Sequence, residues 1–373
     1  MARRPISAAL FAALIATTLA GVAAQGPFDG AQDRPFDGAQ GRPFDGAQGR
    51  PFDGAQGRPF DEAQGRRAFS LGVLRRDGIL IPFAAFTGRA WEVPWPGADT
   101  SVPLPISLAD VPRRWWGPVG PDAAWQAWLP DGTKQPLKLQ KPVHVPIFCG
   151  GHLAIATDYH GQPSAEREPT VPKDAIATAG EVALLPITHV SVNAPDATRL
   201  IAAITEQFNE EETLAAEHFS QWEHPFSSAS RARLPIVLEA FYRATDVGPG
   251  GDFRTSYIEA VRKYPARESD QGCGLVTFVR GWVTEFRDRK PRINIGARVT
   301  FCDRADVSFM HPFGRVRIPR GSGGDSAAAA DVYWVYQTSS WRDEFYGVAR
   351  VTPEAVRPVV VVAGGGCPRE PAR

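Results

Sequence analysis

Short apolar runs separated by turn residues dominate the chain from residue 68 onward. In the stretch 68–96 these runs alternate with the turn dipeptides Asp-Gly and Thr-Gly, and the stretch 125–139 repeats the pattern around Pro-Asp-Gly. Runs rich in Val, Ile and aromatic residues between such turns are typical of antiparallel hairpins. The same texture returns after Pro235, where we expect about seven more strands. The pattern predicts a mainly β fold of barrel- or sandwich-like antiparallel sheets.

One segment, 193–219, breaks this rhythm and predicts a helical insertion. Asn193 is positioned to cap its start, and Asn209 with Glu212 three residues later resembles a second cap. The insertion is therefore expected to hold one or two short helices. The acidic run 210–212 would then lie at a helix N-terminus, where acids favour the dipole. Apolar residues recur at helical spacing at Leu200, Ile201, Ile204, Phe208, Ala215 and Phe219.

The first 24 residues have the pattern of a secretory signal peptide. Arg3 and Arg4 precede an apolar run, and small residues around Ala24 supply a cleavage site. The apolar run is short for a membrane span, so we expect no transmembrane span after cleavage. The sequence predicts an exported protein, periplasmic or extracellular.

Residues 25–67 contain the octapeptide PFDGAQGR, repeated almost without change. One Phe in eight residues cannot build a continuous core, and the recurring Pro removes a backbone donor in each copy. We interpret this segment as a disordered tether. The near-identity of the copies favours tandem duplication of DNA over selection for a fold.

The remaining chain divides by texture into two parts. Residues 68–185 form a tryptophan-rich β region, and residues 186–373 hold the helical insertion and the main β domain. Texture leaves open whether these are two domains or one continuous sheet system.

The four cysteines predict two disulfide bonds in an oxidising compartment. Two strand-like stretches flank the polar segment RDRKP, and a hairpin folded there sets Cys273 opposite Cys302. Cys149 and Cys367 are left as the second pair. This use of Cys149 is favoured over a nucleophilic pair with His152, which would need a free thiol.

Charge excludes some partners. Lysine plus arginine equals aspartate plus glutamate at 41 each, so the formal net charge is zero. A neutral chain gives no reason to expect binding to nucleic acid.

Six of the ten tryptophans lie between Trp91 and Trp128. Flat aromatic faces on a β scaffold are a platform for sugar rings, although large aromatic side chains more often fill a core. The ligand-binding candidates are Trp91, Trp95, Trp115 and Trp116. Trp125 and Trp128 are an odd number of residues apart, so a strand sends them to opposite faces.

The segment HFSQWEH carries the densest group of acid, base and metal-capable side chains. The histidines are six residues apart and do not share a helix face, so no metal site is predicted. A turn after the helix would still be needed to bring the catalytic candidates together. These are Glu217, His218, Glu223 and His224.

No nucleophile elbow, Walker loop or dinucleotide fingerprint is present, and no cofactor is expected. The sequence favours a non-catalytic envelope or extracellular protein, either structural or binding a glycan, an apolar ligand or a protein partner. The alternative is a secreted hydrolase whose carboxylates or histidines converge only in the fold.

Overall fold

The structure is a computed structural model that describes residues 68–98, 103–105, 107–129, 131–161, 173–217, 227–244, 253–266, 273–304, 307–319 and 330–367. These residues all belong to one compact unit, Pro35–Arg369. The predicted signal peptide and the octapeptide repeat lie outside them. Within them the protein is mainly β with antiparallel sheets, as the hydrophobic pattern predicts.

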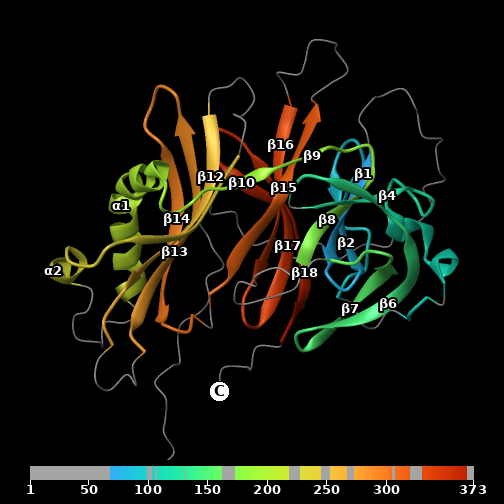
Figure 1. Cartoon of the computed structure of the whole chain (residues 1–373), viewed down its shortest axis with the longest axis horizontal. Coiled ribbons are helices and arrows are strands. Elements are labelled where there is room, and N and C mark those ends of the chain that lie inside the picture. Colours follow the sequence, from blue (N-terminus) through green and yellow to red (C-terminus); the bar gives the residue numbers. More distant parts are fainter. Residues whose placement is uncertain are drawn as a thin grey trace, which may run out of the picture. The chain divides into compact units, whose positions relative to one another are not determined.

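The first eight strands form the N-terminal sheet (Figure 1), in the order β5-β4-β8-β1-β2-β7-β6, with β3 beside β2. The hairpins β1–β2 and β4–β5 turn where the sequence places Asp-Gly and Pro-Asp-Gly. Two short 3-10 helices, Leu108–Asp110 and Arg113–Trp116, precede β4. The strands are β1 Phe69–Arg75, β2 Ile79–Phe86, β3 Trp91–Glu92, β4 Trp125–Trp128, β5 Lys134–Leu137, β6 Leu139–Ile147, β7 Gly150–Thr157 and β8 Lys173–Gly180.

Two five-stranded sheets follow. The central sheet has the order β18-β17-β16-β15-β9, and the helix-covered sheet has the order β10-β11-β12-β13-β14. The central strands are β9 Leu184–Leu185, β15 Phe309–Pro319, β16 Ala330–Ser339, β17 Asp343–Val351 and β18 Val356–Gly366. The others are β10 Ile187–His189, β11 Val237–Ala244, β12 Phe253–Lys263, β13 Leu275–Phe286 and β14 Arg292–Phe301.

The two five-stranded sheets meet at Pro186 and together form a half-barrel. Only this residue separates β9 from β10, and proline has no N–H with which to continue either ladder. Its carbonyl oxygen accepts hydrogen bonds from the Nε (3.3 Å) and Nη2 (3.2 Å) of buried Arg315. Burial, and then repulsion by Arg317, lowers the pKa of Arg315 to about 10. The arginine therefore joins the sheets at a cost in desolvation.

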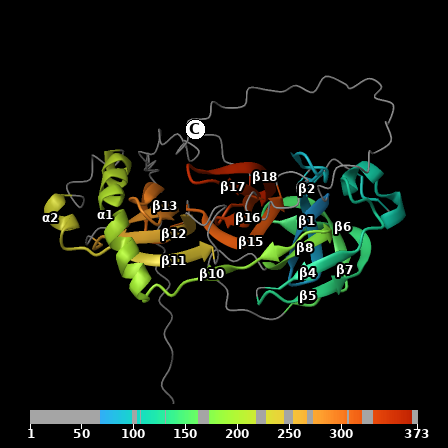
Figure 2. The ribbon, with the colours of Figure 1, turned by 90° about the horizontal axis from the view of Figure 1, so that it is seen from above.

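The outer face of the half-barrel is covered by two elements, one over each of its sheets. Against the central sheet packs the N-terminal sheet, through a cluster that includes Phe83, Ile147, Tyr346 and Val348. Helix α1 (Pro195–Ala216) lies against the helix-covered sheet (Figure 2). Its contacts are made by Leu200, Ile204 and Phe208. On the inner face, the two sheets of the half-barrel pack against each other.

The helical insertion is present with two helices, but three of its details differ from the prediction. α1 is one uninterrupted helix, and the second helix, α2, is the short segment Ser228–Arg231. The N-cap is Ala194, not Asn193, with Pro195 as the first helical residue. Asn209 does not cap a second helix because it lies inside α1, where its Oδ1 accepts a hydrogen bond from Arg262 (3.0 Å).

The predicted position of Glu212 at a helix N-terminus is also wrong. It is fully buried in the last third of α1, where Arg262 donates a hydrogen bond to its carboxylate. Tyr264 donates its hydroxyl proton to the other carboxylate oxygen (2.7 Å), and Arg231 lies 3.1 Å away. The acid therefore fastens the helix to β12 and is not an N-terminal dipole partner.

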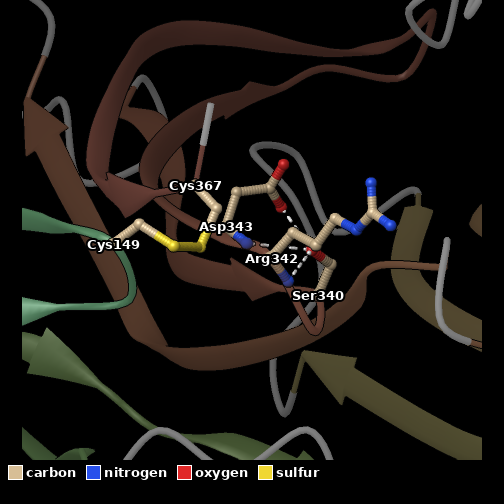
Figure 3. The surroundings of a disulfide bond; sticks show 5 residues. All are labelled: Cys149, Ser340, Arg342, Asp343 and Cys367. Carbon is tan, nitrogen blue, oxygen red and sulfur yellow. Dashed lines mark hydrogen bonds between the residues drawn. A yellow bond between two sulfur atoms is a disulfide. The ribbon is translucent and has the colours of Figure 1, made fainter. Parts of the chain in front are cut away.

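Both predicted disulfide bonds are present, and no cysteine is free. Cys273–Cys302 joins the ends of the β13–β14 hairpin, whose register is centred on the predicted turn. Cys149–Cys367 joins the β6–β7 turn to the residue after β18 (Figure 3). It thereby ties the N-terminal sheet to the central sheet across 218 residues.

Glycines at the end of β18 make this approach possible. A Cβ on Gly365 would lie 2.5 Å from a methyl carbon of Ile147, and one on Gly364 would lie 2.8 Å from the Tyr346 ring. Gly365 therefore allows the close approach of the two sheets, and Gly364 leaves room for a ring on the neighbouring strand β17.

Candidate functional site

The four tryptophans proposed as a binding platform do not share one surface. Trp95 and Trp116 are buried, and Trp115 is half-buried against Trp95 with ring centroids 5.9 Å apart. The indole N–H of Trp95 donates to the carbonyl oxygen of Leu153 (2.8 Å). Trp91 is half-buried in the separate cluster between the sheets, edge-on to Tyr333. Three rings thus gather in one core cluster and the fourth lies in another.

Trp125 and Trp128 occupy opposite faces of β4, as their odd spacing predicts. Trp125 packs in the cluster with Trp95 and Trp116, whereas Trp128 packs in the cluster between the sheets. Both rings are buried and both are structural.

The proposed catalytic group is only partly within the described residues. Glu217 directly follows α1 and is exposed, whereas His218, Glu223 and His224 lie outside the described residues. His152, weighed as the partner of a reactive Cys149, is buried, and its Nδ1 lies 2.8 Å from the carbonyl oxygen of Leu153. The disulfide bond engages Cys149. Among the described residues no three His, Cys, Asp or Glu side chains cluster as a metal site would need.

The inner face of the half-barrel carries an aromatic row that the sequence analysis did not identify. Residues directly opposite one another in antiparallel strands share a face, so the register defines this row. It crosses five strands of the helix-covered sheet, from His189 through Tyr242, Tyr257 and Trp282 to Asn294. Ring centroids are 5.1 Å apart both for His189–Tyr242 and for Tyr257–Trp282.

The central sheet contributes a second aromatic group to the same face. Trp334 lies opposite Arg315 and Ala349, and Tyr336 lies opposite Gly347, which in turn lies opposite Val361. A Cβ on Gly347 would come within 2.3 Å of the Tyr336 ring, so this ring lies across the glycine toward β18. The glycine is needed because the tyrosine occupies its side-chain space.

Contacts between the two walls fill the middle of the half-barrel. Trp282 and Trp334 meet edge to face with centroids 4.9 Å apart. The backbone N–H of Met310 donates to the buried Glu259 carboxylate (2.7 Å). Arg280, opposite Glu259 in the register, donates to the carbonyl oxygen of Ser308 (2.6 Å). Both sheets therefore contribute residues to the floor of this face.

Part of this face is exposed along β14 and β18, and His189 on β10 and Arg317 on β15 are exposed as well. Each of these strands ends its sheet and pairs with only one other described strand. Val361 on β18 is 57% exposed, and Arg298 on β14 is exposed. Between them Trp282 and Tyr336 are half-buried. An apolar surface with polar residues at its margin results, which is the composition typical of small-molecule sites.

Burial controls the ionisation of the tyrosine at this site. It raises the pKa of Tyr336 to about 12, and the positive charge of Arg280 acts in the opposite direction. The phenol therefore stays neutral and protonated near pH 7, where it can donate a hydrogen bond.

A weak sequence signal for this site was available. In YIEAV and VRGWVTEF, charged and aromatic residues alternate on the same strand face: Glu259 follows Tyr257, and Arg280 precedes Trp282 by two residues. A charge on a face with a tryptophan is unusual for a closed core. Which strands oppose these two could not be read from the sequence.

No family model matches this chain, and no curated protein or solved structure is significantly similar to it.

Proposed function

We propose that the protein is an exported, non-catalytic binding protein whose half-barrel holds a small apolar ligand on its inner face. The observation that carries the proposal is the coverage of the two faces. The N-terminal sheet and α1 cover the outer face, whereas the inner face keeps Trp282 and Tyr336 half-buried and Val361 exposed. Partly exposed aromatic side chains on a rigid sheet are the usual lining of such a site.

Export is supported by the disulfide bonds. Two bonds with no free cysteine fit an oxidising, non-cytoplasmic compartment. No helix in the described part of the chain is long and apolar enough to cross a membrane.

The proposed site moves from the tryptophans near the N-terminus to the half-barrel for a physical reason. Trp95 and Trp116 are buried, and their rings pack on each other with centroids 5.8 Å apart. A sugar or apolar ligand could reach them only by displacing core neighbours. Trp282 and Tyr336 are partly exposed and pack against one cluster, whereas the partly exposed Trp91 and Trp115 belong to two different clusters.

Binding can be tested with the neutral dye Nile red, whose fluorescence rises in apolar surroundings. We expect the purified protein to bind the dye, and Val361→Glu to weaken binding about fivefold, because a buried charge would replace an apolar contact worth about 1 kcal/mol. Leu214→Glu is the matched control, because Leu214 on α1 is also 57% exposed but lies outside the half-barrel. Absence of dye binding, or equal loss in both variants, would overturn the proposal.

A further inference from the structure

One tryptophan is presented to solvent on a tight turn. Trp341 lies in the turn between β16 and β17 and is 48% exposed, whereas the other tryptophans of the described residues are buried or half-buried. Within the described part of the chain, the Trp341 indole has no ring contact and donates no hydrogen bond. A partner that covered this indole would remove a large apolar surface from water and could accept its N–H. Trp341 therefore has the chemistry of a binding anchor.

The next residue, Arg342, adds a positive charge to the same turn. It is exposed and forms no ion pair with any residue that the structure describes. Its side chain extends away from the neighbouring disulfide bond (Figure 3). By contrast, Arg350 on β17 pairs with Asp331 (2.7 Å). The guanidinium of Arg342 thus presents a planar set of donors that matches the two oxygens of a carboxylate.

Hydrogen bonds fix the turn that carries both residues. The buried Ser340 hydroxyl accepts the N–H groups of Arg342 and Asp343 (3.0 Å each) and donates to the Asp343 carboxylate (2.5 Å). The N–H of Cys367 donates to the carbonyl oxygen of Arg342 (2.8 Å), and the Cys149–Cys367 disulfide bond holds this contact in place. Binding would order little additional backbone here, which keeps the entropic cost of association low.

We propose that residues 340–343 form a docking surface for an acidic segment of a partner protein. The segment places an apolar or aromatic side chain against Trp341 and a carboxylate against Arg342. Tryptophan and arginine are enriched among the residues that dominate binding energy at protein interfaces. The unpaired charge selects an acidic partner, because complementary charge determines specificity. This proposal does not involve the inner face of the half-barrel, so it stands independently of the proposed function.

A membrane surface fits this turn less well than a peptide does. One indole and one cation bury little area in a bilayer, and a plane of anionic head groups would also approach the half-buried Asp343 carboxylate. A single carboxylate can approach Arg342 alone. The observations therefore favour a protein segment.

A displayed library of random dodecapeptides tests the proposal. Peptides are selected on the wild-type protein, and those that also bind Trp341→Ala are removed. We expect the remaining peptides to be enriched in Asp, Glu and aromatic residues relative to the unselected library. Fluorescence anisotropy of a labelled synthetic copy then measures affinity. Trp341→Ala should weaken binding about tenfold. Arg342→Gln should weaken it about threefold to fivefold, and added salt should reduce the effect of this second substitution.

Arg89→Gln is the matched control. Arg89 is also exposed in a turn, between β2 and β3, where the Thr87 hydroxyl accepts its N–H (3.4 Å), but Gly88 and Ala90 flank it in place of a tryptophan. This variant should bind the peptide as the wild type does, and all three variants should keep the wild-type thermal unfolding temperature. Selection of no Trp341-dependent peptide, or of peptides rich in Lys and Arg, would overturn the proposal. Binding of the wild-type protein to phosphatidylglycerol vesicles that is lost in Trp341→Ala would overturn it in favour of a membrane surface.

Discussion

Buried charged residues in this protein are fixed by several partners at once. Glu212 shows this most clearly, because three side chains contact its carboxylate. They are those of Arg231 in α2, Arg262 in β12 and Tyr264, which directly follows β12. A carboxylate that loses its charge there leaves a buried guanidinium without full compensation. The Arg262 side chain also donates to Leu234 and Asn209, so the whole helix end depends on this acid.

Glu212→Gln should lower the free energy of unfolding by about 3 kcal/mol, because breaking one partner of a buried ion pair is strongly destabilising. Urea denaturation followed by circular dichroism measures the change. Glu211→Gln is the control at the adjacent position, where the side chain is only half-buried and accepts from Gln207 (3.2 Å). A loss below about 1 kcal/mol for Glu212→Gln would show that the network contributes little.

At the scale of elements, the hydrophobic pattern predicts strands and turns well but not their partners. Alternation places the hairpin β13–β14 and the turn between β1 and β2, since each depends on local residues. The pairing of β4 with β8, and of β9 with β15, depends on residues distant in the chain. Local spacing holds no information on such pairs.

The predicted break in the helix has a similar origin. Asn209 and Glu212 have the spacing of a helix cap, and in isolation this spacing favours a helix start. Tertiary contacts override this local preference, because Arg262 on β12 donates hydrogen bonds to both Asn209 and Glu212. The side chains of Asn209 and Glu212 therefore form hydrogen bonds with the sheet and do not cap a new helix.

The close approach of β18 to β6 gives a prediction for one glycine. Gly365→Ala should lower the free energy of unfolding by about 3 kcal/mol, because the new Cβ would overlap Ile147 and the backbone φ is +152°. Thermal denaturation measures the loss. Gly132→Ala provides the comparison, since its φ is +85° but no atom lies within 4 Å of the added Cβ.

The comparison separates steric overlap from backbone strain. Gly132→Ala should cost about 1 kcal/mol, the penalty of a positive φ alone. Equal losses in the two variants would mean that Ile147 moves away freely and that the two sheets are not held tightly together at this point.

At the scale of the molecule, the sequence predicts a mainly β protein with two disulfide bonds, and both are present. It leaves barrel-like and sandwich-like arrangements open, and the structure shows a half-barrel whose two sheets are joined at Pro186. The sequence did not reveal the candidate site because Trp282 and Tyr336 belong to different sheets. Only the fold places both residues on the inner face of the half-barrel. In the tryptophan-rich segment, ring density indicates packing as readily as binding, and Trp95 and Trp116 are buried.

The two disulfide bonds should differ in their contribution to stability. Their sequence separations are 218 and 29 residues, so chain entropy predicts about 5 kcal/mol for Cys149–Cys367 and about 3.5 kcal/mol for Cys273–Cys302. Paired Cys→Ser variants of each bond, compared by urea denaturation under identical conditions, measure the difference. A larger loss from the Cys273–Cys302 pair would show that native contacts, and not loop closure, determine the effect.

The nesting of the bonds also affects biosynthesis. In a chain exported from its N-terminus onward, Cys149 emerges first, and Cys273 and Cys302 both reach the oxidising compartment before its native partner, Cys367. Oxidation in order of emergence would join Cys149 to Cys273. Prompt closure of the β13–β14 hairpin would protect an exported chain against this error, because both intermediate thiols would already be bonded to each other. Where that hairpin closes slowly, the yield of native protein becomes dependent on a disulfide isomerase in the host.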